Sequence, residues 1–454
     1  MMKRFIMVTF SVGLASCSFV GPDYLPPKAI LAGQFALAES SAISDVAFEK
    51  WWESFDDPLL NVYMQRGMSQ SLDIRVARER IAEAQALYRA AGGGGVPAAQ
   101  LSGDARLNST LTLANGTLDV RSLGTLDANF VFDLFGGTAR GVEAAGANFD
   151  AAVLNVWVTR LAFQSELIAA YIDARFFQTV IAITNEGIVN RRRTLQLVEV
   201  QLTVNDVTTL DVTRAEAELS LVQATLPAQK IGFESNAVRL ASLLNVPAQA
   251  VIAEMTRSTT GIPVPSRAFD AGVPVSLLRN RPDIMVAERR LAASMAAVGV
   301  NEAALYPSLS LGGVIRVDTD NALQLGPTLA IPLLGRPRLL ANRDAAVSRA
   351  RQAELNWHLT VQDAVFEVEQ TLSRAKNRRE EMTALSRASQ NFRKLAQLLQ
   401  DTYESRSSTL LELLNAEDDM TNSASSLAQS KRAYAIALAE LAISTGRGTR
   451  AQDD

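Results

Sequence analysis

The chain has 454 residues, with 44 Lys and Arg against 48 Asp and Glu, so its formal net charge is −4. This balance excludes the strongly basic face that nucleic-acid-binding proteins usually carry. Hydrophobic residues make up 48% of the chain, which allows a sizeable core and excludes wholesale disorder. His358 and Cys17 are the only residues of their types, which removes His-based triads, most metal sites and any internal disulfide. We therefore expect no catalytic residues, no cofactor, no metal site and no nucleic-acid partner.

Residues 1–16 predict a signal peptide. Two basic residues open the chain, and the apolar run that follows is too short to span a bilayer. The run ends in Leu14-Ala15-Ser16-Cys17, which resembles the lipobox of bacterial lipoproteins, where cleavage leaves the cysteine to be acylated. The alternative is a plain signal peptide with a chance cysteine nearby. Because the only cysteine falls here, we predict lipidation of Cys17, with more than one acyl chain such as palmitate for stable anchoring.

Two long stretches predict long helices. Proline is absent between Pro97 and Pro227 and again after Pro337, and the second stretch also lacks glycine up to Thr445. We expect helices over about 138–204 and 340–404, each about 100 Å long at 1.5 Å per residue. Long helices of this kind are typical of coiled coils or helical tubes.

The sequence repeats itself after about 200 residues. Three pairs of segments align, at offsets of 210, 199 and 201 residues: Leu72–Gly103 with Pro282–Gly313, Leu134-Phe135-Gly136 with Leu333-Leu334-Gly335, and Leu210-Asp211-Val212 with Leu411-Glu412-Leu413. A duplicated half is the simplest explanation.

The repeat suggests how the chain divides. We predict a lipidated N-terminal segment at 17–60, a first repeat at 61–246, a Pro-rich connector at 247–276, a second repeat at 277–446 and a tail at 447–454.

Each predicted repeat contains one stretch of alternating apolar and polar residues, at about 98–134 and 307–333. Asn115-Gly116 marks a hairpin turn in the first stretch, and a turn is expected near 318–321 in the second. Alternating segments of ten or more residues are typical of transmembrane strands. By pattern alone, a soluble hairpin with one wet face remains the alternative.

Four strands cannot close a barrel by themselves. An open sheet in lipid would leave edge N–H and C=O groups unpaired at several kcal/mol each, and spanning barrels begin at eight strands. If the strands enter a bilayer, several copies must share one barrel, and three copies give twelve strands. Five charged residues would then face a wet lumen: Asp104, Arg106, Asp119, Arg121 and Asp127.

Several motifs resemble one family. Arg279-Asn280-Arg281-Pro282-Asp283-Ile284 and Tyr306-Pro307-Ser308-Leu309 look like the central signature of the TolC-like outer-membrane efflux factors. Val20-Gly21-Pro22-Asp23-Tyr24, just after Cys17, resembles the lipoprotein (NodT-like) branch of that family. The resemblance covers essentially the whole mature chain.

The resemblance implies a mainly α fold with a small β part. It implies a homotrimer, with a twelve-stranded transmembrane barrel continued by a long α-helical coiled-coil tunnel through the periplasm. Such a channel completes a tripartite efflux pump with a periplasmic adaptor and an inner-membrane transporter, here expected to be of the RND type. The expected location is the cell outer membrane, with a lipid anchor.

Two helix turns are expected at the periplasmic tip. The family usually has glycine six residues before an acidic position, and Asn205 and Arg406 stand there instead. Because Arg tolerates the left-handed conformation much less than Asn, we expect the second turn to be built differently.

By position, the resemblance implies that Asp211 and Tyr403 link neighbouring helices across a closed tip, and that Glu412 lies at an acidic ring. We hypothesise that Asp211 pairs with Tyr403 or Arg406 and keeps the entrance narrow until the adaptor docks. The alternative is that these are ordinary solvated polar residues worth under about 1 kcal/mol.

Two runs of charged residues are expected to be solvated helix faces: Arg191-Arg192-Arg193, with an adaptor contact as the alternative, and Glu417-Asp418-Asp419, with a site for a hard cation as the disfavoured alternative. Two functions remain beside the efflux channel, namely a duct for type I protein secretion and a lipid-anchored periplasmic coiled-coil scaffold. An enzyme is disfavoured because no constellation of nucleophile, base or metal ligands is present.

Overall fold

A computed structural model of the chain describes residues 19–37, 50–110, 117–258, 260–265, 274–317 and 322–449. The chain forms two compact units, each assembled from segments that are far apart in the sequence. Unit 1 comprises Met1–Lys28, Arg80–Ala152 and Val286–Trp357. Unit 2 comprises Ala29–Glu79, Val153–Met285 and His358–Asp454.

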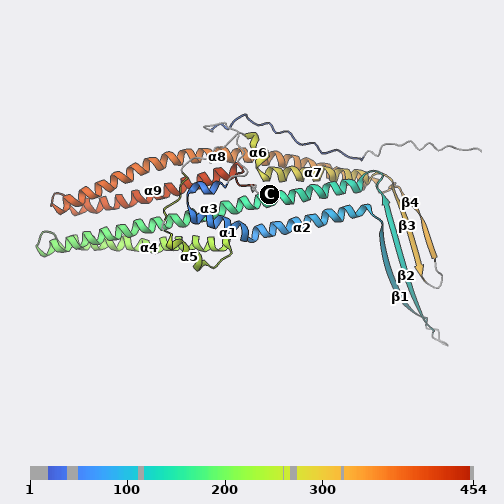
Figure 1. The fold of residues 1–454 in the computed structure, drawn as a ribbon, viewed down its shortest axis with the longest axis horizontal. Coiled ribbons are helices and arrows are strands. Elements are labelled where there is room, and N and C mark those ends of the chain that lie inside the picture. Colours follow the sequence, from blue (N-terminus) through green and yellow to red (C-terminus); the bar gives the residue numbers. More distant parts are fainter. Residues whose placement is uncertain are drawn as a thin grey trace, which may run out of the picture. The chain divides into compact units, whose positions relative to one another are not determined.

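Unit 1 contains a four-stranded antiparallel sheet in the order β1-β2-β3-β4 (Figure 1). The strands are β1 (Ala98–Thr110), β2 (Thr117–Phe132), β3 (Ser308–Val317) and β4 (Ala322–Ala330). β2 pairs with β3, so the two hairpins predicted from the alternating pattern join into one sheet. The turns predicted at Asn115-Gly116 and 318–321 lie outside the described residues.

Both predicted long helices are present. α3 (Gly137–Thr203) has 67 residues and α8 (Arg336–Glu404) has 69, which corresponds to about 100 Å each. After a short turn, α3 is followed by α4 (Thr209–Leu244) and α8 by α9 (Leu410–Ser444). Each pair forms a helical hairpin (Figure 1).

The element order of the first half recurs in the second. α2 (Leu72–Gly92) precedes β1 and α7 (Pro282–Ala303) precedes β3, so each half runs helix, two strands, two long helices. The other elements are η1 (Trp51–Phe55), α1 (Pro58–Gln70), η2 (Gly93–Gly95), α5 (Ala248–Arg257) and α6 (Pro274–Asn280). This recurrence agrees with a duplication, while the boundaries proposed for the repeats stay predictions.

The first described residues, 19–28, form an N-terminal strap across α3 and α7 in unit 1. The Val20 N–H donates to the Phe135 carbonyl at 3.2 Å, and Arg140 Nε donates to the Val20 carbonyl at 3.4 Å. Further along, the Tyr24 hydroxyl donates to the Glu288 carboxylate at 2.9 Å. The strap therefore begins beside the end of β2 and is held by side chains of both helices.

A buried polar cluster joins α1 and α3 in unit 2. Asp57 caps α1, and its carboxylate also accepts a hydrogen bond from the Tyr171 hydroxyl at 2.7 Å. Arg175 is fully buried and donates to the Tyr171 hydroxyl at 3.0 Å and to the Ser258 hydroxyl at 3.0 Å. Burial raises the pKa of Tyr171, which keeps the hydroxyl protonated as a donor. Because its charged members have partners, the cluster avoids the cost of burying a lone charge.

Among the described helices, α3 passes a simple test of length and composition for crossing a membrane. Its most apolar 18-residue window has a mean hydropathy of 1.4, and half of that window is buried inside the protein. A buried core helix passes the same test, so this is weak evidence for a spanning helix.

Candidate functional site

The register of the sheet assigns every strand residue to one of two faces, because paired residues and every second residue along a strand share a face. One face is mainly polar and includes Gln100, Ser102, Asp104, Arg106, Asn108, Asp119, Arg121, Thr125, Asp127, Asn129, Ser310, Arg316, Gln324 and Thr328. All five predicted lumen residues therefore lie on one face. Whether that face lines a lumen stays a prediction.

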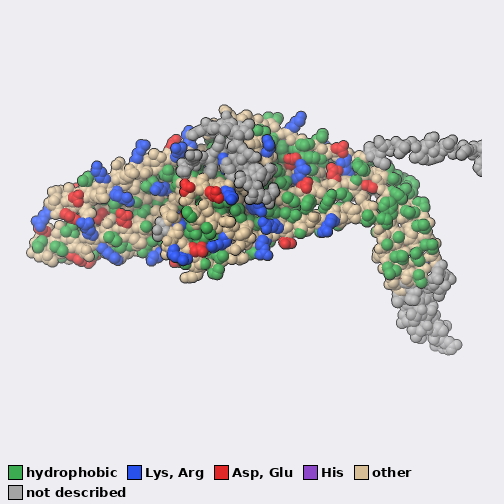
Figure 2. All heavy atoms as spheres, viewed as in Figure 1, with side chains coloured by type: hydrophobic (Ala, Val, Ile, Leu, Met, Phe, Trp, Pro, Cys, Tyr) green, Lys and Arg blue, Asp and Glu red, His purple; other side chains and the backbone are tan. Residues whose placement is uncertain are grey.

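The opposite face of the sheet is apolar and exposed. Its large side chains that are 37% to 78% exposed are Leu101, Leu126, Phe132, Leu311, Ile315, Val317, Leu323, Leu325 and Leu329. Figure 2 shows hydrophobic side chains gathered over the described part of the strands. An apolar band on one face of a sheet, with polar residues on the other, is typical of a strand wall between lipid and water.

The first hairpin is longer than the second. β3 pairs with β2 only from Gly124 to Phe132, whereas β1 pairs with β2 as far as Thr117. By register, Asp127 lies in the four-stranded part, and four charged residues lie in the two-stranded extension: Asp104, Arg106, Asp119 and Arg121. Alternation continues through both parts, so the sequence pattern did not reveal this division. β4, the shortest of the four strands, has nine residues, which matches one bilayer crossing.

Aromatic residues mark the end of the sheet next to the helices. Phe130 and Phe132 lie on the apolar face with ring centroids 4.9 Å apart. Phe135, between β2 and α3, stacks on Tyr306 at 4.6 Å. Aromatic girdles are found at the two membrane interfaces of transmembrane barrels. This end of the sheet therefore has the composition of an interface.

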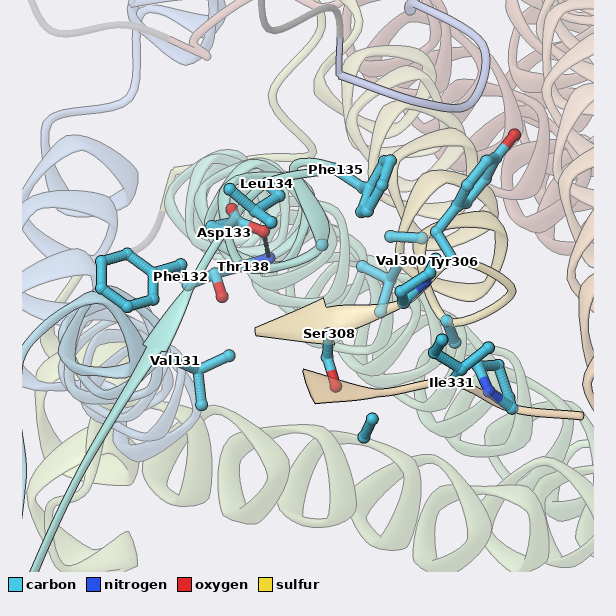
Figure 3. Close-up of a pocket in the computed structure, with 16 residues that line it drawn as sticks. Val131, Phe132, Asp133, Leu134, Phe135, Thr138, Val300, Tyr306, Ser308 and Ile331 are labelled. Carbon is cyan, nitrogen blue, oxygen red and sulfur yellow. Dashed lines mark hydrogen bonds between the residues drawn. The ribbon is translucent and has the colours of Figure 1, made fainter. Parts of the chain in front are cut away.

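A cavity of about 450 Å³ lies where the sheet meets α3 and α7 (Figure 3). Val131, Ser308 and Ala330 line it from the polar face of the sheet. Asp133 also lines it, and its carboxylate accepts hydrogen bonds from the N–H groups of Thr138 at 3.1 Å and of the next residue at 2.8 Å. The carboxylate thus caps α3, where the positive end of the helix dipole favours it. Most of the remaining lining is apolar.

The turns between α3 and α4 and between α8 and α9, both in unit 2, have the same backbone structure. Asn205 has φ 61° and Arg406 has φ 63°, both left-handed. The next residue's N–H closes the turn in each case: Asp206 bonds to the Gln201 carbonyl at 3.0 Å, and Ser407 bonds to the Thr402 carbonyl at 2.7 Å. This is the Schellman pattern of helix ends. The expectation that Arg406 gives the second turn a different structure was wrong, because these closing bonds impose the conformation.

The acidic residues after the turns cap their own helices. Asp211 accepts from the Thr208 N–H at 2.9 Å, and Glu412 accepts from the Thr409 N–H at 2.8 Å. These backbone hydrogen bonds lower the pKa of both carboxyl groups. Asp211 and Glu412 are therefore equivalent members of two capping boxes, in which the N-cap residues are Thr208 and Thr409.

The remaining gate candidates link the two helical hairpins within one chain. The Tyr403 hydroxyl donates to the Gln201 side chain at 2.7 Å, and Arg406 forms an ion pair with Asp206. Tyr403 is 5% exposed, and burial raises its pKa, as does the charge of Asp211. Within the described chain, the hydrogen bonds of Asp211 thus go to Thr208, and those of Tyr403 to Gln201. The expected pairing between subunits stays a prediction.

A buried ion pair joins α3 to α9 in unit 2. Arg191, whose side chain is 3% exposed, donates to the Glu417 carboxylate at 2.9 Å and to the Leu414 carbonyl at 3.0 Å. Thr194 donates to the other Glu417 oxygen at 2.8 Å. Burial, the largest cause, raises the pKa of Glu417. The expectation of solvated helix faces was wrong for Arg191 and Glu417. The sequence signal that pointed to burial was that each lies three residues from a partner on its own helix, Thr194 and Leu414, and so shares a helix face with it.

Comparison with known proteins places this architecture. The family model described as "Outer membrane efflux protein" matches residues 64–246 and 273–447. Nodulation protein T of Rhizobium leguminosarum bv. trifolii is 32% identical over 461 residues, covering 98% of this chain and 97% of that protein. Cation efflux system protein CusC of Escherichia coli K12 is 25% identical over 429 residues, covering 90% and 92%.

Solved structures resemble the fold along most of the chain. The outer-membrane channel OprN has a TM-score of 0.85 at 28% identity, covering 95% of this chain and 99% of that one. The Campylobacter jejuni CmeC outer membrane channel has a TM-score of 0.84 at 18% identity, covering 96% of both chains.

Proposed function

The chain belongs to the outer membrane efflux protein family, and on that premise we propose that it is the passive, trimeric exit duct of a tripartite pump. The protein is an outer-membrane channel component of an efflux system, and the family and its structural neighbours are channel proteins rather than enzymes. In this proposal the energy for transport comes from partners, and the chain supplies the pore.

The two-faced sheet with open edges carries the proposal. Its apolar face suits lipid, its polar face suits a wet lumen, and its two edge strands need partners before the sheet can enter a bilayer. Three copies supply twelve strands, above the minimum of eight for a spanning barrel. Asp127 would then line the lumen at membrane depth, and four residues of the two-stranded extension would line it beyond the bilayer: Asp104, Arg106, Asp119 and Arg121.

Membrane extraction tests the duct against the scaffold. We expect the protein to remain in outer membranes after high-pH carbonate washing, even as the Cys17→Ser variant, because the barrel holds it. The purified trimer should also form pores in planar bilayers. Release of the Cys17→Ser variant by carbonate, with the wild-type protein retained, would favour the lipid-anchored scaffold and overturn the duct.

Cys17 is proposed to carry the lipid anchor at the membrane interface. Cys17 itself lies outside the described residues, but Phe19, two residues later, packs beside the aromatic junction of β2 and α3. Two residues span at most about 7 Å, which suits an acyl chain entering the bilayer at this level. Metabolic labelling with a palmitate analogue should mark the wild-type protein and leave Cys17→Ser unlabelled; labelling of both would reject this site.

The helix turns are proposed to form the periplasmic tip, where an adaptor docks and opens the channel, with an RND-type transporter in the inner membrane. Asp211, Tyr403, Arg406 and Glu412 are proposed as gate residues. The contacts of Tyr403 and Arg406 with the neighbouring hairpin support a role in holding the two hairpins together.

Single-channel conductance tests the gate. Asp211→Ala combined with Tyr403→Phe should raise the conductance of the resting channel, because the links that hold the tip narrow are weakened. Asp401→Ala, an exposed acidic position on α8, is the matched control and should leave conductance unchanged. A double variant that conducts like the wild-type channel would reject the gate while leaving the duct intact.

A further inference from the structure

The outer edges of β1 and β4 have no strand partner within the described chain, since these are the first and last strands of the sheet. If the proposed trimeric duct is correct, each edge meets its opposite in a neighbouring copy. Such a duct already requires β4 to pair with β1 of the next subunit. We propose the register of this pairing: the internal repeat predicts that the numbers of two paired residues add up to 430.

The register follows from a pairing already present in the chain. β2 and β3 pair so that residue numbers add up to 441, as in Leu126 with Ile315. Through the repeat, β2 corresponds to β4 with a shift of 199, as in Phe135 and Leu334, and β3 corresponds to β1 with a shift of 210, as in Pro307 and Pro97. Raising 441 by 199 and lowering it by 210 gives 430. The β4–β1 pairing between subunits is thus predicted to be equivalent to the β2–β3 pairing between the two hairpins of one chain.

This register keeps both faces continuous across the subunit boundary. It places Leu329 opposite the partner subunit's Leu101, and Thr328 opposite the partner subunit's Ser102. Leu329 and Leu101 are 61% and 78% exposed in the single chain, so they are free to meet on the lipid face. A register changed by one residue would instead set apolar side chains against polar ones on both faces.

Two other registers would also keep the polar and apolar faces continuous, and each differs from the proposed register by two residues. A slip of this size occurs inside the chain. When the same shifts are applied to the β1–β2 pairs, the residue numbers of β3–β4 pairs are predicted to add up to 636, whereas in the structure they add up to 638. The second hairpin is therefore shifted by two residues relative to the first, and its residues keep the same faces of the sheet. The competitors to 430 are therefore 428 and 432, and the experiment has to separate these three.

The strand–helix junction supplies a second observation, namely two exposed side chains that this register would cover. Phe135 is covered by Tyr306, which approaches from the α7–β3 connection. Its equivalent, Leu334, is 99% exposed, and the equivalent of Tyr306 is Val96, which is 59% exposed. The repeat brings Leu334 against the partner subunit's Val96 and so covers both. An almost fully exposed leucine beside a membrane-facing sheet is otherwise costly to leave in water.

Disulfide trapping between introduced cysteines tests the register directly. The chain's one natural cysteine, Cys17, does not compete, because it is proposed to be acylated. The variants are Leu329→Cys with Leu101→Cys and Thr328→Cys with Ser102→Cys, two adjacent pairs that between them sample both hydrogen-bonding classes of antiparallel positions. Competing registers are tested by Leu329→Cys with Ala99→Cys and Leu329→Cys with Gly103→Cys. Leu334→Cys with Val96→Cys tests the junction. The single-cysteine variants are controls.

Oxidation of isolated outer membranes should convert at least one of the 430 pairs, and the junction pair, to covalent dimers and trimers. The yield should exceed that of the 428 and 432 pairs by at least about tenfold, since a shift of two moves Cβ atoms to about 7 Å, beyond disulfide reach. Preferential cross-linking of the 428 or 432 pair would overturn the register and leave the barrel. A carbonate-resistant trimer in which no pair cross-links would overturn the edge pairing. A monomer that carbonate removes would instead overturn the proposed duct.

Discussion

Asn205 and Arg406 occupy equivalent positions in two helix turns, and Phe135 and Leu334 occupy equivalent positions in two strand–helix junctions. The turns have the same structure, with φ of 61° and 63°. The junctions differ: Phe135 is stacked on Tyr306, whereas Leu334 is 99% exposed. Hydrogen bonds between residues a few positions apart build each turn, while a distant segment has to cover each junction. Within the single chain, the two turns therefore share their local structure, whereas the two junctions differ in burial.

The largest expected effect comes from the ion pair that joins the two hairpins. Arg191→Ala should lower the free energy of unfolding by about 3–5 kcal/mol, because Glu417 remains as a buried carboxylate without its partner. Denaturant unfolding of the detergent-solubilised protein, followed by circular dichroism, measures the change.

Arg193→Ala is the matched control for that prediction. Arg193 pairs with Glu404, and its side chain is 66% exposed, so the loss should be under about 1 kcal/mol. Equal losses for the two arginines would show that the buried pair contributes no more than a surface pair.

The covered junction should be sensitive to a single methyl group. Gly136 has φ 77°, and a Cβ there would lie 2.2 Å from the Phe19 ring. Gly136→Ala should cost about 2 kcal/mol through the left-handed conformation and the displaced ring. At Gly335 a Cβ meets nothing within 4 Å, so Gly335→Ala should cost under about 0.5 kcal/mol. Thermal unfolding of both variants measures the difference, and similar midpoints would contradict the contrast between the junctions.

Equal effects are expected at the two helix turns. Thr208→Ala and Thr409→Ala should each cost about 1 kcal/mol, because each removes a cap that works with Asp211 or Glu412. Hydrogen exchange of the first amides of α4 and α9 reports each turn separately. Faster exchange at one turn alone would show that the two turns are less alike than their backbone angles indicate.

The smallest expected effect distinguishes the two left-handed residues. Arg406→Gly should stabilise the protein by about 0.5 kcal/mol, since relief of the left-handed Arg exceeds the loss of an exposed ion pair with Asp206. Asn205→Gly should change stability by only a few tenths, about 0.2 kcal/mol, because Asn tolerates this conformation. A destabilised Arg406→Gly would mean that the Asp206 contact outweighs backbone strain.

The sequence predicted some features of these sites and missed others for identifiable reasons. The absence of proline, and in the second stretch also of glycine, was enough to predict α3 and α8, because helix propensity acts locally. Alternation was enough to predict the strands and the shared face of Asp104 and Asp127. The runs of charged residues led to a wrong prediction of solvated helix faces. Arg191 and Arg193 are two residues apart, or about half a helix turn, so one side chain is buried and the other is in solvent.

By itself, the sequence determined the long helices, the alternating strands, the internal similarity of its two halves and the resemblance to a family of outer-membrane channels. Periodicity and composition carry these features, since they depend on neighbours within a few residues or on repeated patterns. The tertiary structure alone decided that β2 pairs with β3, that the first hairpin extends beyond the second, and that Arg406 adopts the left-handed conformation of Asn205. These features depend on which distant segments meet and on hydrogen bonds that offset the cost of a left-handed residue. Neither can be predicted from the conformational preference of a single residue.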